Sequence, residues 1–116
     1  MLEENKKNCI FCKIAAGSID ADIKYEDDKA VAFSDINPQA PIHVLVIPRR
    51  HISTLDEADG NILGHLVAVG RDVARKEGVA RQGYRLLVNC GDMGGQEVPH
   101  LHVHILGGRQ MKWPPG

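Results

Sequence analysis

Three histidines alternate with aliphatic residues in the segment Pro99-His-Leu-His-Val-His-Ile-Leu-Gly. Successive side chains of a β-strand point to opposite faces of a sheet. A strand over residues 100–106 therefore places His100, His102 and His104 on one face and directs the aliphatic residues into a core. This pattern predicts a half-buried strand with imidazoles on its polar face, and no other feature constrains the fold as strongly.

The chemistry of imidazole indicates what this strand can do. Imidazole changes charge near neutral pH. A neutral ring nitrogen can attack phosphorus, and a neighbouring ring can donate a hydrogen bond to phosphoryl oxygens. The histidines therefore favour nucleophilic catalysis on a phosphate. One alternative is a three-histidine metal site, whose ligands usually come from more than one element. The other is a solvent-exposed face that carries histidine without a function.

Two further segments can serve a phosphate substrate. The glycine-rich loop over residues 89–98 lets backbone amides approach an anion, and Asn89 and Gln96 add donors. Asp35 follows a predicted strand, where a carboxylate can accept hydrogen bonds from both ribose hydroxyls. Taken alone, each segment is more typical of an ordinary loop or turn. The adjacent histidines favour the functional interpretation of the loop.

Cys9 and Cys12 have the two-residue spacing of a zinc knuckle, whereas Cys90 is isolated. Because there is no second cysteine pair, histidines must complete a tetrahedron, and His51 and His100 are the candidates. A structural Cys2His2 zinc site is favoured over two reduced thiols or a redox pair.

Periodicity and turn residues predict five strands, over residues 23–28, 30–33, 42–47, 84–89 and 100–106. A short helical turn is expected over residues 9–16. The main helix is expected over residues 59–77, with a buried stripe of Ile62, Leu66, Val69 and Val73. Because the strands are not separated by regular helices, the fold class is α+β with an antiparallel sheet.

The length of 116 residues suits one domain, expected over residues 9–116 after a mobile lead-in over residues 1–8. A net charge of −1 provides no global field for nucleic acid or acidic membranes. No segment has the length of a membrane span or the apolar core of a signal peptide. A cytoplasmic location without nucleic-acid or membrane partners is therefore expected. His43 and His65 are interpreted as structural or exposed, without a role.

The chain resembles the histidine triad (HIT) family, and within it the Hint branch of nucleotide-binding proteins. The family pattern is His-x-His-x-His followed by apolar residues, and residues 100–106 match it. The likeness includes Asp35-Ile-Asn-Pro-Gln-Ala-Pro and Leu45-Val-Ile-Pro-Arg-Arg-His-Ile-Ser. It ends in the tail Leu106-Gly-Gly-Arg-Gln-Met-Lys-Trp-Pro-Pro-Gly, which is specific to the branch.

This resemblance implies a two-fold homodimer with a continuous sheet, in which the tail over residues 107–116 reaches the active site. It implies hydrolysis of AMP-type phosphoramidates through a covalent nucleotidyl-histidine intermediate, with AMP and GMP as purine ligands and no organic cofactor. His102 resembles the nucleophile, His104 a hydrogen-bond donor to the phosphate, and His100 an orienting residue or zinc ligand. The implied nucleotide contacts are Phe33 and Ile36 at the purine, Asp35 at the ribose, Asn89, Gly95, Gln96 and Glu97 at the phosphate, and Trp113 from the partner subunit.

Two positions depart from the branch. Glu97 stands where many members have a serine near the leaving group, so a carboxylate there can act as a general acid or repel the phosphate. Ser34 stands where some relatives have histidine. Two other functions remain open. One is a dinucleoside polyphosphate hydrolase or nucleotidyltransferase, which the tail argues against. The other is a zinc-stabilised nucleotide-binding adaptor with residual activity.

Overall fold

The computed structural model describes residues 8–116, so most of the predicted lead-in lies outside the described residues. The helices are α2 (Ile10–Ala15), the 3₁₀ helix η1 (Leu55–Glu57) and α3 (Gly60–Lys76). The strands are β1 (Ile23–Glu26), β2 (Ala30–Ser34), β3 (Ile42–Pro48), β4 (Tyr84–Val88) and β5 (Val103–Gly107). The predicted α+β class, with five strands, a main helix and a short N-terminal helix, is confirmed.

All five strands form one antiparallel sheet in the order β1-β2-β3-β5-β4. Strand β5, which carries His104, pairs on both sides: Leu45 of β3 and Leu87 of β4 both lie opposite His104. The last strand begins at Val103 rather than at the predicted residue 100. The preceding segment takes a different partner, since the Leu101 amide donates to the Ile52 carbonyl over 2.7 Å.

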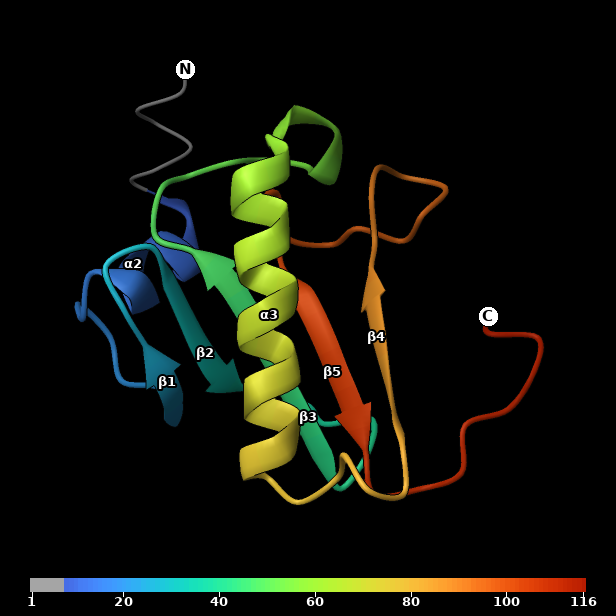
Figure 1. The fold of residues 1–116 in the computed structure, drawn as a ribbon. Helices are drawn as coiled ribbons and strands as arrows, with labels where there is room; N and C mark the ends of the chain where they lie inside the picture. The colour runs from blue at the N-terminus through green and yellow to red at the C-terminus, as the bar shows by residue number, and fades with distance from the viewer. Residues whose placement is uncertain (1–7) are drawn as a thin grey trace.

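Helix α3 lies across one face of the sheet (Figure 1). Asp59 caps its N-terminus by accepting a hydrogen bond from the Ile62 amide over 2.9 Å, and Gly78 follows its end with φ +81°. The buried stripe includes Leu66, Val69 and Val73, as the periodicity predicts. These side chains pack on Leu101, Val103, Ile105 and inward residues of β2 and β3.

The opposite face of the sheet is covered by α2 in the part that carries the histidines. Phe11 of α2 packs there on Val31, Phe33, Leu45 and Ile47 in a second hydrophobic cluster. Alternate residues of β2 and β3 therefore enter two different cores. The triad thus lies under an apolar cover rather than on an open polar surface.

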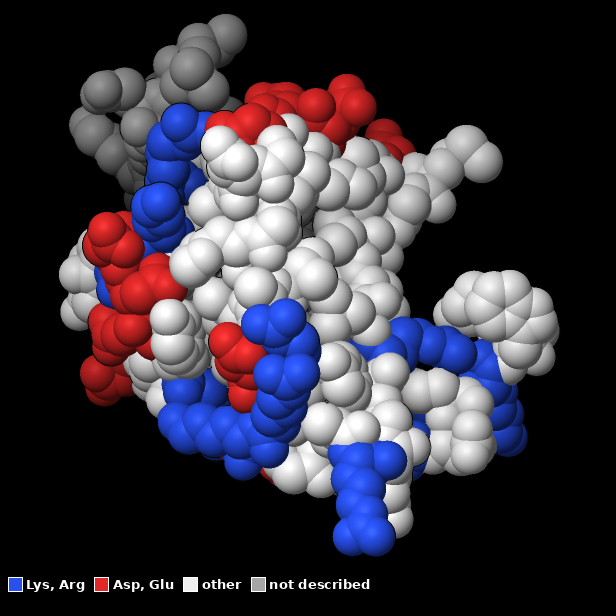
Figure 2. Space-filling model, viewed as in Figure 1, with Lys and Arg blue, Asp and Glu red and all other residues white. Residues whose placement is uncertain are grey.

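The chain leaves β5 at Gly107 and Gly108 and continues as an extended tail past β4 (Figure 1). A Cβ at Gly107 would lie 2.8 Å from the Val79 Cβ, and Gly108 has φ +90° with Pro41 close by, so both positions require glycine. Acidic and basic side chains mix along the β1 side of the face covered by α3, beside a broad uncharged area (Figure 2). Within residues 8–116, no helix is long and apolar enough to cross a membrane.

Candidate functional site

The triad histidines point to the α2 side of the sheet, and Leu101, Val103 and Ile105 point to the α3 side. The alternation expected from the sequence is therefore present. The histidine face is nevertheless largely closed to solvent, because His100 is 0% exposed and His102 is 6% exposed. The reason is Phe11, whose ring meets the His100 and His102 rings edge-on at 5.9 and 5.1 Å between centroids.

The position of the proton on His102 follows from its neighbour. The His102 Nδ1 lies 2.7 Å from the His100 carbonyl oxygen. A carbonyl oxygen only accepts hydrogen bonds, so Nδ1 carries the proton and donates. In the neutral ring, Nε2 is then the nitrogen with a free lone pair. His102 is thus held in the tautomer that a nucleophilic Nε2 requires.

A fourth histidine, His43, sets the tautomer of His104, although the sequence indicates no role for it. The Gln39 amide donates to the His43 Nδ1 over 3.0 Å, so a neutral His43 carries its proton on Nε2. That Nε2 lies 3.0 Å from the His104 Nδ1 and 3.5 Å from an Asp35 carboxylate oxygen. His104 Nδ1 therefore accepts, and its own proton lies on Nε2.

His104 Nε2 is a buried nitrogen without a hydrogen-bond partner among the described residues. Such a donor is costly to bury unless a ligand atom pairs with it. The His102 and His104 rings are 4.9 Å apart between centroids. A lone pair and an unpartnered N–H are thus presented side by side, which is the combination that attack on a phosphate needs.

Burial keeps the His43 and His104 rings neutral. Loss of hydration, reinforced by the neighbouring His102 and His43, lowers the pKa of His104 to about 4. Burial also lowers the pKa of His43, although the charge of Asp35 opposes the shift. Both rings are therefore neutral at physiological pH, as the tautomer assignment assumes.

His102 and His104 line a cavity of about 460 Å³ between α2 and the sheet. Its walls are mainly apolar and include Ile10, Phe11, Ile14 and Ile19. Of the residues expected to contact a nucleotide, it gathers Phe33, Asp35, Ile36, Glu97, His102 and His104. Ile36 is 98% exposed at its rim, an unusual position for an aliphatic side chain unless a ligand covers it.

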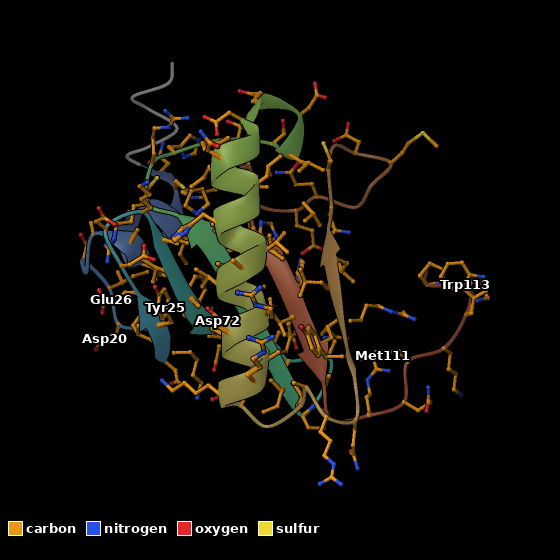
Figure 3. The ribbon with its side chains drawn as sticks, in the orientation of Figure 1. Asp20, Tyr25, Glu26, Asp72, Met111 and Trp113 are labelled. Carbon is orange, nitrogen blue, oxygen red and sulfur yellow. The ribbon has the colours of Figure 1, made fainter. Side chains whose placement is uncertain are left out.

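Four expected contact residues do not line this cavity: Asn89, Gly95, Gln96 and Trp113. Asn89 donates to the Gly94 carbonyl over 2.7 Å, and Gln96 donates to the Ser53 carbonyl over 2.7 Å, so both amides shape the loop. Trp113 is 83% exposed and lies on the tail beyond β4, far from α2 (Figure 3).

A second cluster joins Cys9, Cys12, His51 and His100, whose ligand atoms all lie within 4.8 Å of one another. The His100 Nδ1 is 3.2 Å from the Cys9 sulfur, and the His51 Nδ1 is 3.2 Å from the Cys12 sulfur. A zinc tetrahedron with bonds of about 2.3 Å to sulfur and about 2.0 Å to nitrogen has edges of roughly 3.3–3.8 Å. The donor set and its spacing therefore fit zinc.

His100 is prepared for a metal in two further ways. Its Nε2 donates to the Pro48 carbonyl over 2.9 Å, which leaves the Nδ1 lone pair facing the cysteines. Burial lowers the pKa of His100 to about 4, so the ring is neutral, as a metal ligand must be.

Comparison with known protein families matches residues 16–111 to the HIT domain. This chain belongs to the HIT domain family. The match covers the sheet, α3 and the triad, so the family resemblance seen in the sequence is confirmed, as is the HIT-like fold.

Individual relatives agree with this assignment to the family. The crystal structure of a HIT family hydrolase from Legionella pneumophila superimposes with a TM-score of 0.91 at 48% identity, over 94% of this chain and 100% of that one. A 14 kDa zinc-binding protein of Zea mays is 48% identical over 112 residues, which are 92% of this chain and 87% of the maize protein. A zinc-bound histidine triad protein from Mycobacterium smegmatis has a TM-score of 0.80 at 30% identity, over 90% of this chain and 77% of its own.

The depressed pKa of His104 makes the stability of the fold depend on pH. The unfolded chain titrates this group near 6.5 and the folded protein near 4, so the unfolded state binds more protons between these values. Stability from this group is complete above pH 6.5 and is lost as the pH falls towards 4. Urea unfolding from pH 7.5 to 4 should show a loss about 2 kcal/mol larger for the natural protein than for His104→Asn. If the unfolding free energy of the two proteins fell in parallel with pH, the result would contradict this prediction.

Proposed function

We propose that this chain is a hydrolase that cleaves phosphoramidates of purine nucleoside monophosphates, AMP–amine conjugates above all, through a nucleotidyl-His102 intermediate. The observation that carries the proposal is the pairing of two nitrogens in one cavity: the deprotonated Nε2 of His102 and the unpartnered N–H of His104. The first can attack phosphorus, and the second can stabilise the charge that develops on a phosphoryl oxygen.

The reaction proceeds in two displacements. In the first, the His102 Nε2 lone pair forms a bond to the α-phosphorus while the phosphorus–nitrogen bond breaks, and the nitrogen keeps the electron pair, takes a proton from solvent and leaves as the amine. In the second, water attacks the same phosphorus and gives up a proton to solvent, while the bond to Nε2 breaks, the electron pair returns to the ring and AMP is released. The His100 carbonyl stabilises the ring in both steps, because it accepts the Nδ1–H of the ring that becomes positively charged.

The cavity suggests where each part of the nucleotide binds. We assign the purine to the apolar wall with Phe33 and Ile36 and the ribose to Asp35. The phosphate is assigned to His104, whose Nε2–H has no partner among the described residues. For Asn89, Gly95, Gln96 and Glu97 the assignment rests on the family resemblance, because only Glu97 lines the cavity and the Gly95 and Gln96 amides donate to the Asp92 and Gly91 carbonyls. His43 acts through His104 as a positioning residue. We propose both AMP and GMP as ligands of this cavity.

His102→Ala should lose more than about a thousandfold in turnover of an adenosine phosphoramidate while still binding AMP. The reason is that the substitution removes the attacking nitrogen but not the cavity walls. Intact-mass analysis of a rapidly quenched reaction should detect an adenylyl adduct on the natural protein and none on the variant. His65→Ala is the matched control, since His65 contacts Asp27 outside the cavity and its loss should leave the adduct in place. AMP binding without adduct or amine release would instead favour a nucleotide-binding protein without this activity.

We also propose that Cys9, Cys12, His51 and His100 hold one structural zinc ion. The fit of the donor atoms supports it, as does the likeness to zinc-binding relatives. A bound zinc would join α2 to the segment that carries the triad. Helix α2 has six residues, too few to be stable alone, so this link matters for the cover of the cavity.

Metal analysis should therefore find one zinc per chain. Its removal by a chelator should lower the unfolding free energy by about 3 kcal/mol or more and the melting temperature by roughly 10 °C or more. Cys12→Ser should reproduce this loss, while Cys90→Ser, which changes a cysteine outside the cluster, should keep the metal and the stability. Metal-free protein with unchanged stability would rule out a structural ion.

We further propose a homodimer in which the tail of one subunit completes the site of the other. Strand β4 pairs on one side only and so offers an open edge. Arg85 of β4 donates to the Lys112 carbonyl over 2.9 Å and thereby directs the tail away from its own cavity. The exposed indole of Trp113 is available to a second copy (Figure 3).

A complementation experiment tests this arrangement. Sedimentation should give a dimer, and Trp113→Ala should lose about tenfold in kcat/KM, the loss expected for an aromatic anchor. Mixing Trp113→Ala with the inactive His102→Ala should restore activity, because exchanged dimers contain one site with an intact His102 and an intact partner tail. If the tail serves its own subunit, mixing restores nothing.

A further inference from the structure

The charged groups around the catalytic cavity are all of one sign. Among the residues that line it within the described chain, the ionisable ones are Asp20, Asp35, Glu97, His102 and His104, with no lysine or arginine. His104 is neutral near pH 7 because burial lowers its pKa to about 4. A cavity proposed to receive a phosphate therefore carries three carboxylates and no permanent cation to balance them.

The three carboxylates occupy different parts of the cavity. Asp35 is held in place, since one of its oxygens accepts the Asn37 amide over 2.9 Å and the other lies 3.5 Å from His43. Asp20 comes from the connection between α2 and β1 and lies on the β1 side of the molecule (Figure 3). Glu97 comes from the loop that leads into the triad, so of the three carboxylates it is the nearest in sequence to the reacting histidines.

The neighbours of Glu97 on both sides make hydrogen bonds, whereas the Glu97 side chain makes none among the described residues. The preceding Gln96 donates to the Ser53 carbonyl over 2.7 Å and to the Val98 carbonyl over 3.1 Å. The following Val98 also accepts the His100 amide over 2.8 Å and packs against the cluster of Phe11 and Phe33. Within residues 8–116, no hydrogen bond or ion pair engages the Glu97 carboxylate, which is exposed at the cavity. The loop thus presents an unpaired carboxylate at the cavity that His102 and His104 also line.

An unpaired carboxylate beside a phosphate raises the energy of any further negative charge and lowers that of a positive one. A polyphosphate brings additional negative charges to this end of the cavity. A phosphoramidate brings one negative charge on phosphorus and an amine side that can be neutral, anionic or cationic. A positively charged amine side best balances the three carboxylates that line the cavity.

We propose that Glu97 selects substrates whose amine leaving group bears a second, positively charged ammonium group, and disfavours anionic amines and polyphosphates. This inference rests on the proposed phosphoramidase function and specifies its leaving group. The class includes conjugates of AMP with diamines.

Three AMP phosphoramidates of matched length test the proposal, with 1,4-diaminobutane, butylamine and 4-aminobutanoate as the amines. The natural protein should prefer the diamine conjugate over the butylamine conjugate by about fivefold in kcat/KM, as for an ion pair in contact with water. Rising salt should reduce that ratio. Glu97→Gln should bring the ratio close to one, and Glu97→Lys should favour the 4-aminobutanoate conjugate.

Asp92→Asn is the matched control, because Asp92 belongs to the same loop but does not line the cavity. It should keep the fivefold ratio. Binding of the three conjugates to His102→Ala, measured by calorimetry, gives the same comparison without turnover. Cleavage of all three conjugates at equal rates would overturn the role of Glu97 and leave the phosphoramidase function standing. Failure to bind or cleave any of them would remove both, and faster cleavage of a diadenosine polyphosphate would reverse the proposed selectivity.

Discussion

Every polar atom of the fully buried His100 is engaged, and the arrangement of the site depends on those contacts. Its Nδ1 lies 3.2 Å from the Cys9 sulfur, and its Nε2 donates to the Pro48 carbonyl of β3. Its own carbonyl accepts the proton of His102. An imidazole without hydration is costly to bury unless its nitrogens are paired, so these contacts hold one another in place. The residue that orients the proposed nucleophile therefore does not line the cavity itself.

A second constraint is the use of both faces of one sheet. Residues that alternate along β3 and β5 supply an aliphatic core under α3 on one side. On the other side they supply the histidines and the apolar cluster under α2. Because neighbours along the strand belong to different cores, close packing on the α3 side limits how far the imidazoles can shift. This provides the preorganisation that electrostatic stabilisation of a phosphate requires.

The sequence predicted the helices and strands better than the contacts between them. The helical spacing of Leu66, Val69 and Val73 located α3 closely, since this signal is local. The alternation at residues 100–105 correctly divided the two faces, but nothing in it revealed that Phe11 covers the imidazoles. His43 was missed for the same reason. It shares a face with Leu45 and Ile47, which hinted at burial, but its contact with His104 depends on a strand register between segments 61 residues apart.

Helix α2 has a double role that links two equilibria. Its N-cap Cys9 and its Cys12 belong to the candidate zinc site, while Ile10, Phe11 and Ile14 form a wall of the cavity. Docking of this short segment on the sheet therefore contributes both to the binding of a ligand in the cluster and to the binding of a ligand in the cavity. By reciprocity, a ligand in the cavity shifts the equilibrium of α2 towards its docked state by the same factor by which docking of α2 tightens that ligand. The cluster and the cavity hold different ligands, and the six residues of α2 couple the two sites.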